Sequence, residues 1–73
     1  MYIVVELQKT GDQVGNFVYA YKNRNEAESR FYAVLSAAAV SEVPVHSAVL
    51  IDEQCNLYNS GVYEHPPKEG GSS

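Results

Sequence analysis

The strongest constraint on the fold comes from four short runs that alternate like β-strands. One helical run divides them into two pairs. Turn-forming residues, Gly11 and Asp12, lie between the members of the first pair, and a polar loop around Glu53 and Gln54 lies between the members of the second. Each pair therefore predicts a β-hairpin. The four runs cover residues 2–9, 14–22, 45–52 and 57–64.

The segment between the pairs predicts a helix that ends near Val40. Asn25 is the expected N-cap, with Glu28 three residues later as in a capping box, and Pro44 cannot continue the helix. One apolar stripe recurs at helical spacing, formed by Ala27, Phe31, Val34, Leu35 and Ala38.

One helix with a single apolar stripe, together with two hairpins, favours a two-layer arrangement. We expect an α+β fold of order ββαββ, a two-layer sandwich whose four-stranded, mainly antiparallel sheet carries one helix on one face. The 73 residues leave room for one domain, expected over residues 1–65. Residues 66–73 hold no apolar side chain and predict a disordered tail.

The expected sheet is apolar on both faces. An antiparallel sheet with one solvated face normally alternates apolar and polar residues, but neither register is polar in the last three strand runs. An exposed patch of this kind marks a partner or ligand surface. Depending on register, the face away from the helix should expose several of Val4, Tyr19, Tyr21, Leu50, Tyr58 and Val62.

A small domain needs further stabilisation, and the sequence limits where this can come from. Cys55 is the single cysteine, so no disulfide forms within the chain. With His46 and His65 it makes too few ligands for a structural zinc site. We therefore expect self-association into a homodimer or a higher homo-oligomer, and no cofactor or metal.

Charge and cysteine usage indicate the surroundings of the protein. The net charge of −4 disfavours binding to nucleic acid or to an anionic membrane. One unpaired cysteine favours a reducing compartment, and no run is long enough for a signal peptide or a membrane span. A cytoplasmic location is expected.

Tyrosines and basic residues are the candidate site residues. Five of the six tyrosines lie on strand runs, where sheet packing explains them most simply, with a subunit interface or ring-stacking ligand site as the alternative. Arg24 and Arg30 lie near the expected helix start and suggest an anion site, although a Glu26–Arg30 pair is the simpler reading. The candidates for a ligand site or interface are Tyr19, Tyr21, Arg24, Arg30, His46, Tyr58 and Tyr63.

No residue pattern indicates catalysis. His46 and His65 start and end the second hairpin, where they should approach each other, but we read them as a surface and a strand-end histidine. Cys55 has no basic neighbour, and Asp52 and Glu53 are read as turn formers. Catalytic residues and metal ligands are therefore not expected, and the chain is not expected to be an enzyme.

Four segments carry a resemblance: residues 1–8, 25–32, 37–41 and 58–65. The chain is similar to small uncharacterised proteins encoded by phages and prophages of gut Firmicutes over most of residues 1–65. The resemblance implies a phage accessory protein that counters host defence. In that class, small oligomers sequester a nucleotide-type immune signal between subunits, while others bind and occlude a host defence protein in the manner of anti-CRISPR proteins.

Overall fold

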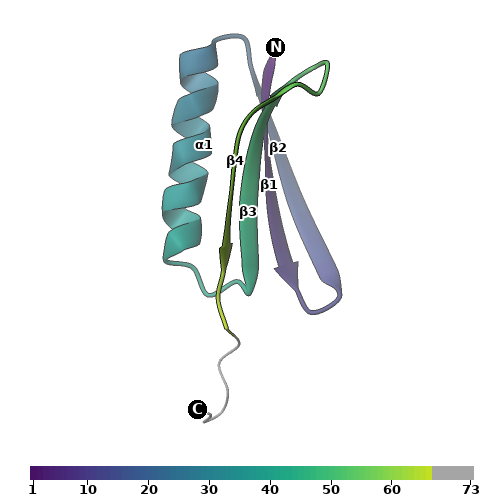
Figure 1. The fold of residues 1–73 in the computed structure, drawn as a ribbon, viewed down its shortest axis with the longest axis vertical. Helices are drawn as coiled ribbons and strands as arrows, with labels where there is room; N and C mark the ends of the chain where they lie inside the picture. Colours follow the sequence, from purple (N-terminus) through teal and green to yellow (C-terminus); the bar gives the residue numbers. More distant parts are fainter. Residues whose placement is uncertain (67–73) are drawn as a thin grey trace.

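The computed structural model describes residues 1–66 as one sheet and one helix in the order ββαββ, which confirms the predicted α+β fold (Figure 1). The predicted tail lies outside the described residues except for Pro66. The elements are β1 (Tyr2–Thr10), β2 (Gln13–Tyr21), α1 (Arg24–Ala39), β3 (Val45–Asp52) and β4 (Leu57–Glu64).

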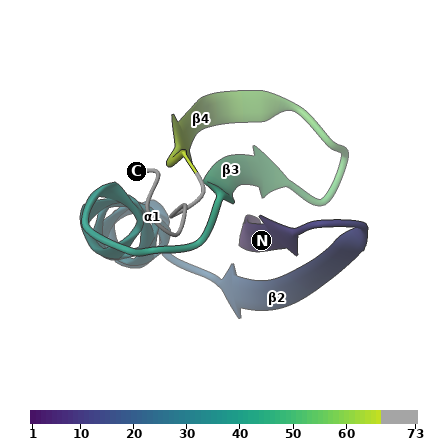
Figure 2. The same ribbon diagram turned by 90° about the horizontal axis from the view of Figure 1, so that it is seen from below.

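The sheet has the strand order β2-β1-β3-β4, and each neighbouring pair is antiparallel. The two hairpins thus lie side by side, joined through β1 and β3, and α1 connects them. The edge strands are β2 and β4. Figure 2 shows α1 on one side of the sheet only.

The two hairpin turns use different chemistry. Gly11 has a φ of 61° and allows a tight turn between β1 and β2, as its position in the sequence indicated. In the other turn the Asp52 carboxylate accepts hydrogen bonds from the backbone N–H groups of Gln54 and Asn56, at 2.8 and 3.0 Å. This local network allows Cys55 to take a φ of 66°.

The helix begins two residues earlier than predicted, because Asn23 is its N-cap in place of Asn25. The extended backbone of Asn23 lets its Oδ1 accept from the N–H groups of Asn25 and Glu26, at 2.7 and 3.4 Å. Glu28 forms no capping box. Its carboxylate lies 3.1 Å from the Arg24 Nε atom in an ion pair one turn apart.

The predicted apolar stripe of α1 packs on the sheet as expected. Phe31, Val4 and Leu50 are the largest fully buried side chains. Around them lie Ala27, Val34 and Ala48, with Leu35 partly buried beside the core. A Cβ atom on Gly61 would lie 2.9 Å from Leu35 Cδ1, so any other residue here would require the Leu35 side chain to shift.

The register decides which of the two apolar faces the helix covers. Val4 pairs with Tyr19 on one side and with Leu50 on the other, so these three side chains share the helix face. Of the residues expected on the uncovered face, Val62 alone lies there. That expectation was wrong for Val4 and Leu50, which are buried beneath α1, and for Tyr19, Tyr21 and Tyr58, which lie on the helix side.

Candidate functional site

The uncovered side of the sheet, here called the open face, is largely aliphatic. Strand alternation and register place its side chains in four rows that run across β2, β1, β3 and β4. Among the described residues, the open face carries charged side chains only in the row that contains Lys9 and Glu64. The rows are Val14, Lys9, Val45 and Glu64; Asn16, Leu7, Ser47 and Val62; Val18, Val5, Val49 and Ser60; and Ala20, Ile3, Ile51 and Leu57.

Large side chains on the open face remain exposed to solvent. Val18 is 62% exposed, Val62 is 57% exposed and Leu57 is 63% exposed. A hollow of about 400 Å³ runs over the centre of this face, with Val5, Leu7, Val49 and Val62 among the residues that line it. This arrangement can bury apolar surface against another molecule, and it offers few groups for polar chemistry.

A second feature lies on the helix side, near the start of α1, and we call it the tyrosine–arginine cluster. In its first half, the Arg30 guanidinium stacks on the Tyr19 ring, with 4.5 Å between the guanidinium carbon and the ring centroid. The Arg30 Nε atom also donates a hydrogen bond of 3.0 Å to the Tyr21 hydroxyl. The cluster consists of Tyr2, Tyr19, Tyr21, Tyr58, Arg24 and Arg30.

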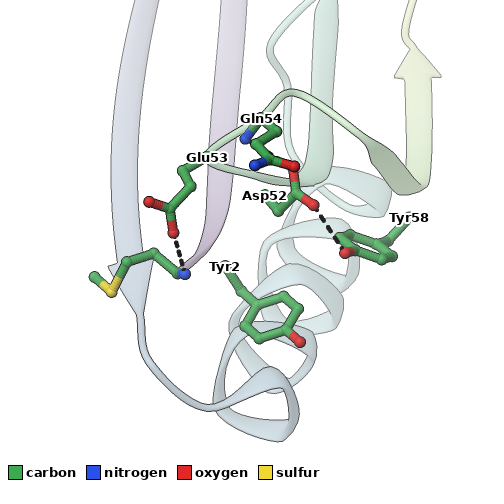
Figure 3. A pocket seen from close by; sticks show the side chains of 6 residues that line it. Tyr2, Asp52, Glu53, Gln54 and Tyr58 are labelled. Carbon is green, nitrogen blue, oxygen red and sulfur yellow. Dashed lines mark hydrogen bonds and ion pairs between the residues drawn. The ribbon is translucent and has the colours of Figure 1, made fainter.

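In the other half of the cluster, Tyr2 and Tyr58 line a small pocket (Figure 3). The Tyr2 and Tyr58 rings lie with centroids 5.7 Å apart, and the Arg24 guanidinium lies 4.9 Å from the Tyr58 centroid. Figure 3 shows the Tyr58 hydroxyl directed at Asp52, to which it donates a hydrogen bond of 2.9 Å. The pocket has a volume of about 230 Å³, and Glu53 and Gln54 line its far side.

Hydrogen bonding shifts the pKa of several groups here. The Asn56 side chain and backbone N–H, with further help from Tyr58 and Gln54, lower the pKa of Asp52 to about 2. The bond to Asp52 in turn raises the pKa of Tyr58. The hydrogen bond to Tyr21 raises the pKa of Arg30. The Arg30 guanidinium and the Asp52 carboxylate beside the cluster are therefore ionised near neutral pH.

The predicted pairing of Arg30 with Glu26 is wrong, because Arg30 reaches back across the sheet to the tyrosines of β2. Arg24 forms the ion pair one turn apart instead, with Glu28. Arg30 has no carboxylate partner among the residues that the structure describes. Its charge is therefore available to an anion.

The expectation that His46 is a surface histidine is also wrong. His46 is 4% exposed, and its Nε2 atom lies 2.7 Å from Glu6 Oε2. On the other side of the ring, Nδ1 lies 3.0 Å from the Ser41 hydroxyl. This Ser–His–Glu line could not be predicted from the sequence, because its members come from three segments that only the fold brings together.

The line has the residue types of a hydrolytic triad, but its hydroxyl is committed elsewhere. Ser41 Oγ lies 3.3 Å from the Ala38 carbonyl oxygen, to which it can donate, and it accepts from the Val43 N–H at 3.3 Å. The pockets described above are lined by other residues. We read the line as a structural network that fixes the end of α1 on the sheet.

The remaining candidates lie away from the cluster. His65 bonds through Nε2 to the Ala38 carbonyl oxygen at 2.8 Å, so the two histidines contact different groups and form no pair. Tyr63 lies beside His46 in the register and is 41% exposed. Six residues of strand separate His46 from the cluster row at Asp52, which is about 20 Å. The structure thus brings together five candidates and leaves His46 and Tyr63 apart.

Within residues 1–66, no three histidine, cysteine, aspartate or glutamate side chains gather in a way that could hold a metal ion. Cys55 is exposed in its turn. The one helix in that range lacks the length and apolar character to cross a membrane.

Comparisons of the chain with protein-family models, curated proteins and solved structures gave no significant match.

Proposed function

We propose that this protein is a non-enzymatic, self-associating binding protein that sequesters a small ligand of nucleotide type. The observation that carries the proposal is the open face, a sheet surface of aliphatic side chains that the chain's own helix leaves uncovered. Covering such a surface with another molecule is favourable in water, and exposed patches of this kind mark interaction surfaces. A second copy of the same chain is the partner that is always present.

The size of the open face suits this role. Four strands about 4.8 Å apart, over eight residues of about 3.3 Å each, span about 500 Å² in projection. Two such faces in contact remove about 1,000 Å² or more from water, which is the lower bound for a stable interface. Aligned packing of two twisted sheets is a common way to bury surfaces of this kind.

The tyrosine–arginine cluster supports the choice of ligand. Tyrosine rings stack on nucleobases with little regard to the base, and each stack contributes roughly 1–3 kcal/mol. Arg30 is held by Tyr19 and Tyr21 but has no carboxylate partner among the described residues, so its forked donors suit a phosphate group. The cluster lies on the helix side of the sheet, so in this proposal each subunit binds its ligand away from the open face, and not between subunits as the resemblance implied.

The expected biological role is the one implied by the phage-like segments of the sequence. A protein that retains a nucleotide signal without converting it would blunt a host immune response by lowering the free concentration of that signal. Tight retention in a stoichiometric complex, and not turnover, is the property this role requires.

Retention and turnover can be separated in one experiment. The purified protein is mixed with linear and cyclic mono- and dinucleotides, desalted, denatured and analysed by mass spectrometry. We expect an unchanged nucleotide to be recovered from the wild type and lost from Arg30→Gln, while Lys22→Gln, outside the cluster, retains it. Recovery of a converted nucleotide would show an enzyme, and recovery of none would contradict the ligand part of the proposal.

Self-association has its own pair of matched variants. Val18→Lys places a charge on the open face at a position that is 62% exposed, so the fold itself should tolerate it. Val40→Lys makes the same change at the end of α1, where the side chain is 83% exposed and away from the open face. In light scattering after gel filtration we expect the first variant to dissociate and the second to keep the wild-type mass. Equal behaviour of the two variants would rule out the open face as the interface.

A further inference from the structure

The two charged residues of the open face lie in one row at one end of the sheet. Lys9 is on β1 and Glu64 is on β4, with Val45 of β3 between them. Two strand spacings, about 10 Å, separate their backbones. Neither residue forms an ion pair within residues 1–66. Both are exposed, so each stands beside aliphatic neighbours without a partner of its own.

Covering the open face would take both charges partly out of water. An ionised group that loses water without gaining a partner is strongly destabilising, whereas a pair that meets across an interface fixes its register. The position of these two charges therefore limits how two copies can pack.

Two symmetric arrangements bring identical sheet faces together with their strands aligned. If the two-fold axis runs across the strands, the first row of one copy covers the last row of the other. Lys9 then faces Ile3 and Glu64 faces Leu57 of the second copy, so both charges are buried against aliphatic side chains. This arrangement leaves each charge uncompensated.

If the axis runs along the strands, each row of one copy lies over the same row of the second copy, with the order of the strands reversed. Strand β1 then lies over β3 of the second copy, and β4 lies over β2. Lys9 and Glu64 of the second copy come within one strand spacing, about 4.8 Å, of each other in projection, and the two Lys9 residues come equally close. Each lysine thus lies between the second copy's Lys9 and its Glu64, and it pairs with the carboxylate on its outer side. The long lysine side chain spans that offset, and symmetry forms the pair twice.

We propose that two copies pack open face to open face about a two-fold axis along the strands, with Lys9 of each copy paired to Glu64 of the other. The inference rests on the proposed self-association and specifies its geometry. The apolar rows, centred on Val5 and Val49, form the dry middle of the interface, and the charge pairs lie at one end. Both tyrosine–arginine clusters remain on the outer, helix-bearing sides.

Charge reversal tests the pairing in the full chain. Lys9→Glu and Glu64→Lys each place like charges together, so we expect each to raise the dimer dissociation constant about ten-fold or more in sedimentation equilibrium. The double variant restores the pair with its signs exchanged and should return to within about three-fold of wild type. Glu26→Lys, a reversal on the exposed surface of α1 and away from the open face, should leave the constant unchanged.

The outcomes separate this inference from the proposal beneath it. If the wild type is dimeric and the single reversals have no effect, or the double variant shows no rescue, the pairing is overturned while self-association stands. A monomeric wild type overturns both.

Discussion

The His46 Nε2 atom lies 2.7 Å from the Glu6 Oε2 atom, in a buried contact that joins β3 to β1 beneath the end of α1. Gln8 donates a second hydrogen bond to the same oxygen at 2.9 Å, and the Ser41 hydroxyl meets the opposite side of the imidazole. The described part of the chain has no buried side-chain nitrogen or oxygen without a partner. The contact therefore satisfies two polar side chains that the fold takes out of water.

Removing one member of this contact should destabilise the protein strongly. Glu6→Leu leaves a histidine that is 4% exposed without its acceptor, and we expect the free energy of unfolding to fall by about 3 kcal/mol. Urea denaturation followed by circular dichroism, at one fixed protein concentration, measures the change. Glu6→Leu combined with His46→Leu removes both polar groups and should recover most of the loss.

The matched control is Glu26→Gln, which changes an exposed carboxylate in the first turn of the helix. We expect a change within about 0.5 kcal/mol. A loss in Glu6→Leu no larger than in this control would show that the buried contact contributes nothing to stability.

The Asp52 turn predicts a pH dependence. Its folded pKa of about 2 lies below the ordinary value of 3.8, so acidification protonates the carboxyl of the unfolded chain first. The stabilisation is therefore present above about pH 4 and is lost as the pH falls toward 2. Thermal unfolding between pH 5 and 2 should show a smaller fall in Tm for Asp52→Asn than for the wild type. Asp12→Asn, an exposed carboxylate in the other hairpin turn, should follow the wild type, and equal curves for all three proteins would refute this prediction.

Asn23 caps α1, whereas Asn25 lies inside its first turn, so substitutions at the two positions should have different effects. Asn23→Ala removes the acceptor of two backbone N–H groups and should lower the free energy of unfolding by about 1 kcal/mol. Asn25→Ala makes the same chemical change inside the first turn, where no side-chain hydrogen bond of Asn25 is described, and should change stability by less than 0.5 kcal/mol, on the order expected for a surface site. Denaturation curves of the two variants give the comparison. A larger loss of stability in Asn25→Ala than in Asn23→Ala would show that Asn25 is the N-cap, as the sequence pattern predicts.

Local patterns in the sequence were sufficient for the fold. Alternation and turn residues predicted all four strands, and the spacing of Phe31 and Val34 predicted which side of the helix is buried. The helix start was misplaced because Asn23 and Asn25 both suit a cap, and only the extended backbone of Asn23 distinguishes them. Propensity alone does not resolve such a choice.

The faces of the sheet could not be assigned in advance, because both registers are apolar. Shifting the register of a strand by one residue exchanges the side chains that face the helix with those on the open face. Nothing in the pattern of Val4 and Val5 favours one face over the other. Packing settles the choice: Tyr19 shares a face with Val4, so the rings gather under and beside the helix and the aliphatic set is left uncovered. The Glu6–His46 contact was equally hidden, since 40 residues separate its members.

The mass of the wild-type protein in solution tests the central claim most directly. Sedimentation equilibrium at micromolar concentration should give about 16 kDa, twice the chain mass of 8.0 kDa, with dissociation only on dilution. A mass of 8.0 kDa that persists across that range would show that the open face stays uncovered in water, and it would contradict the account.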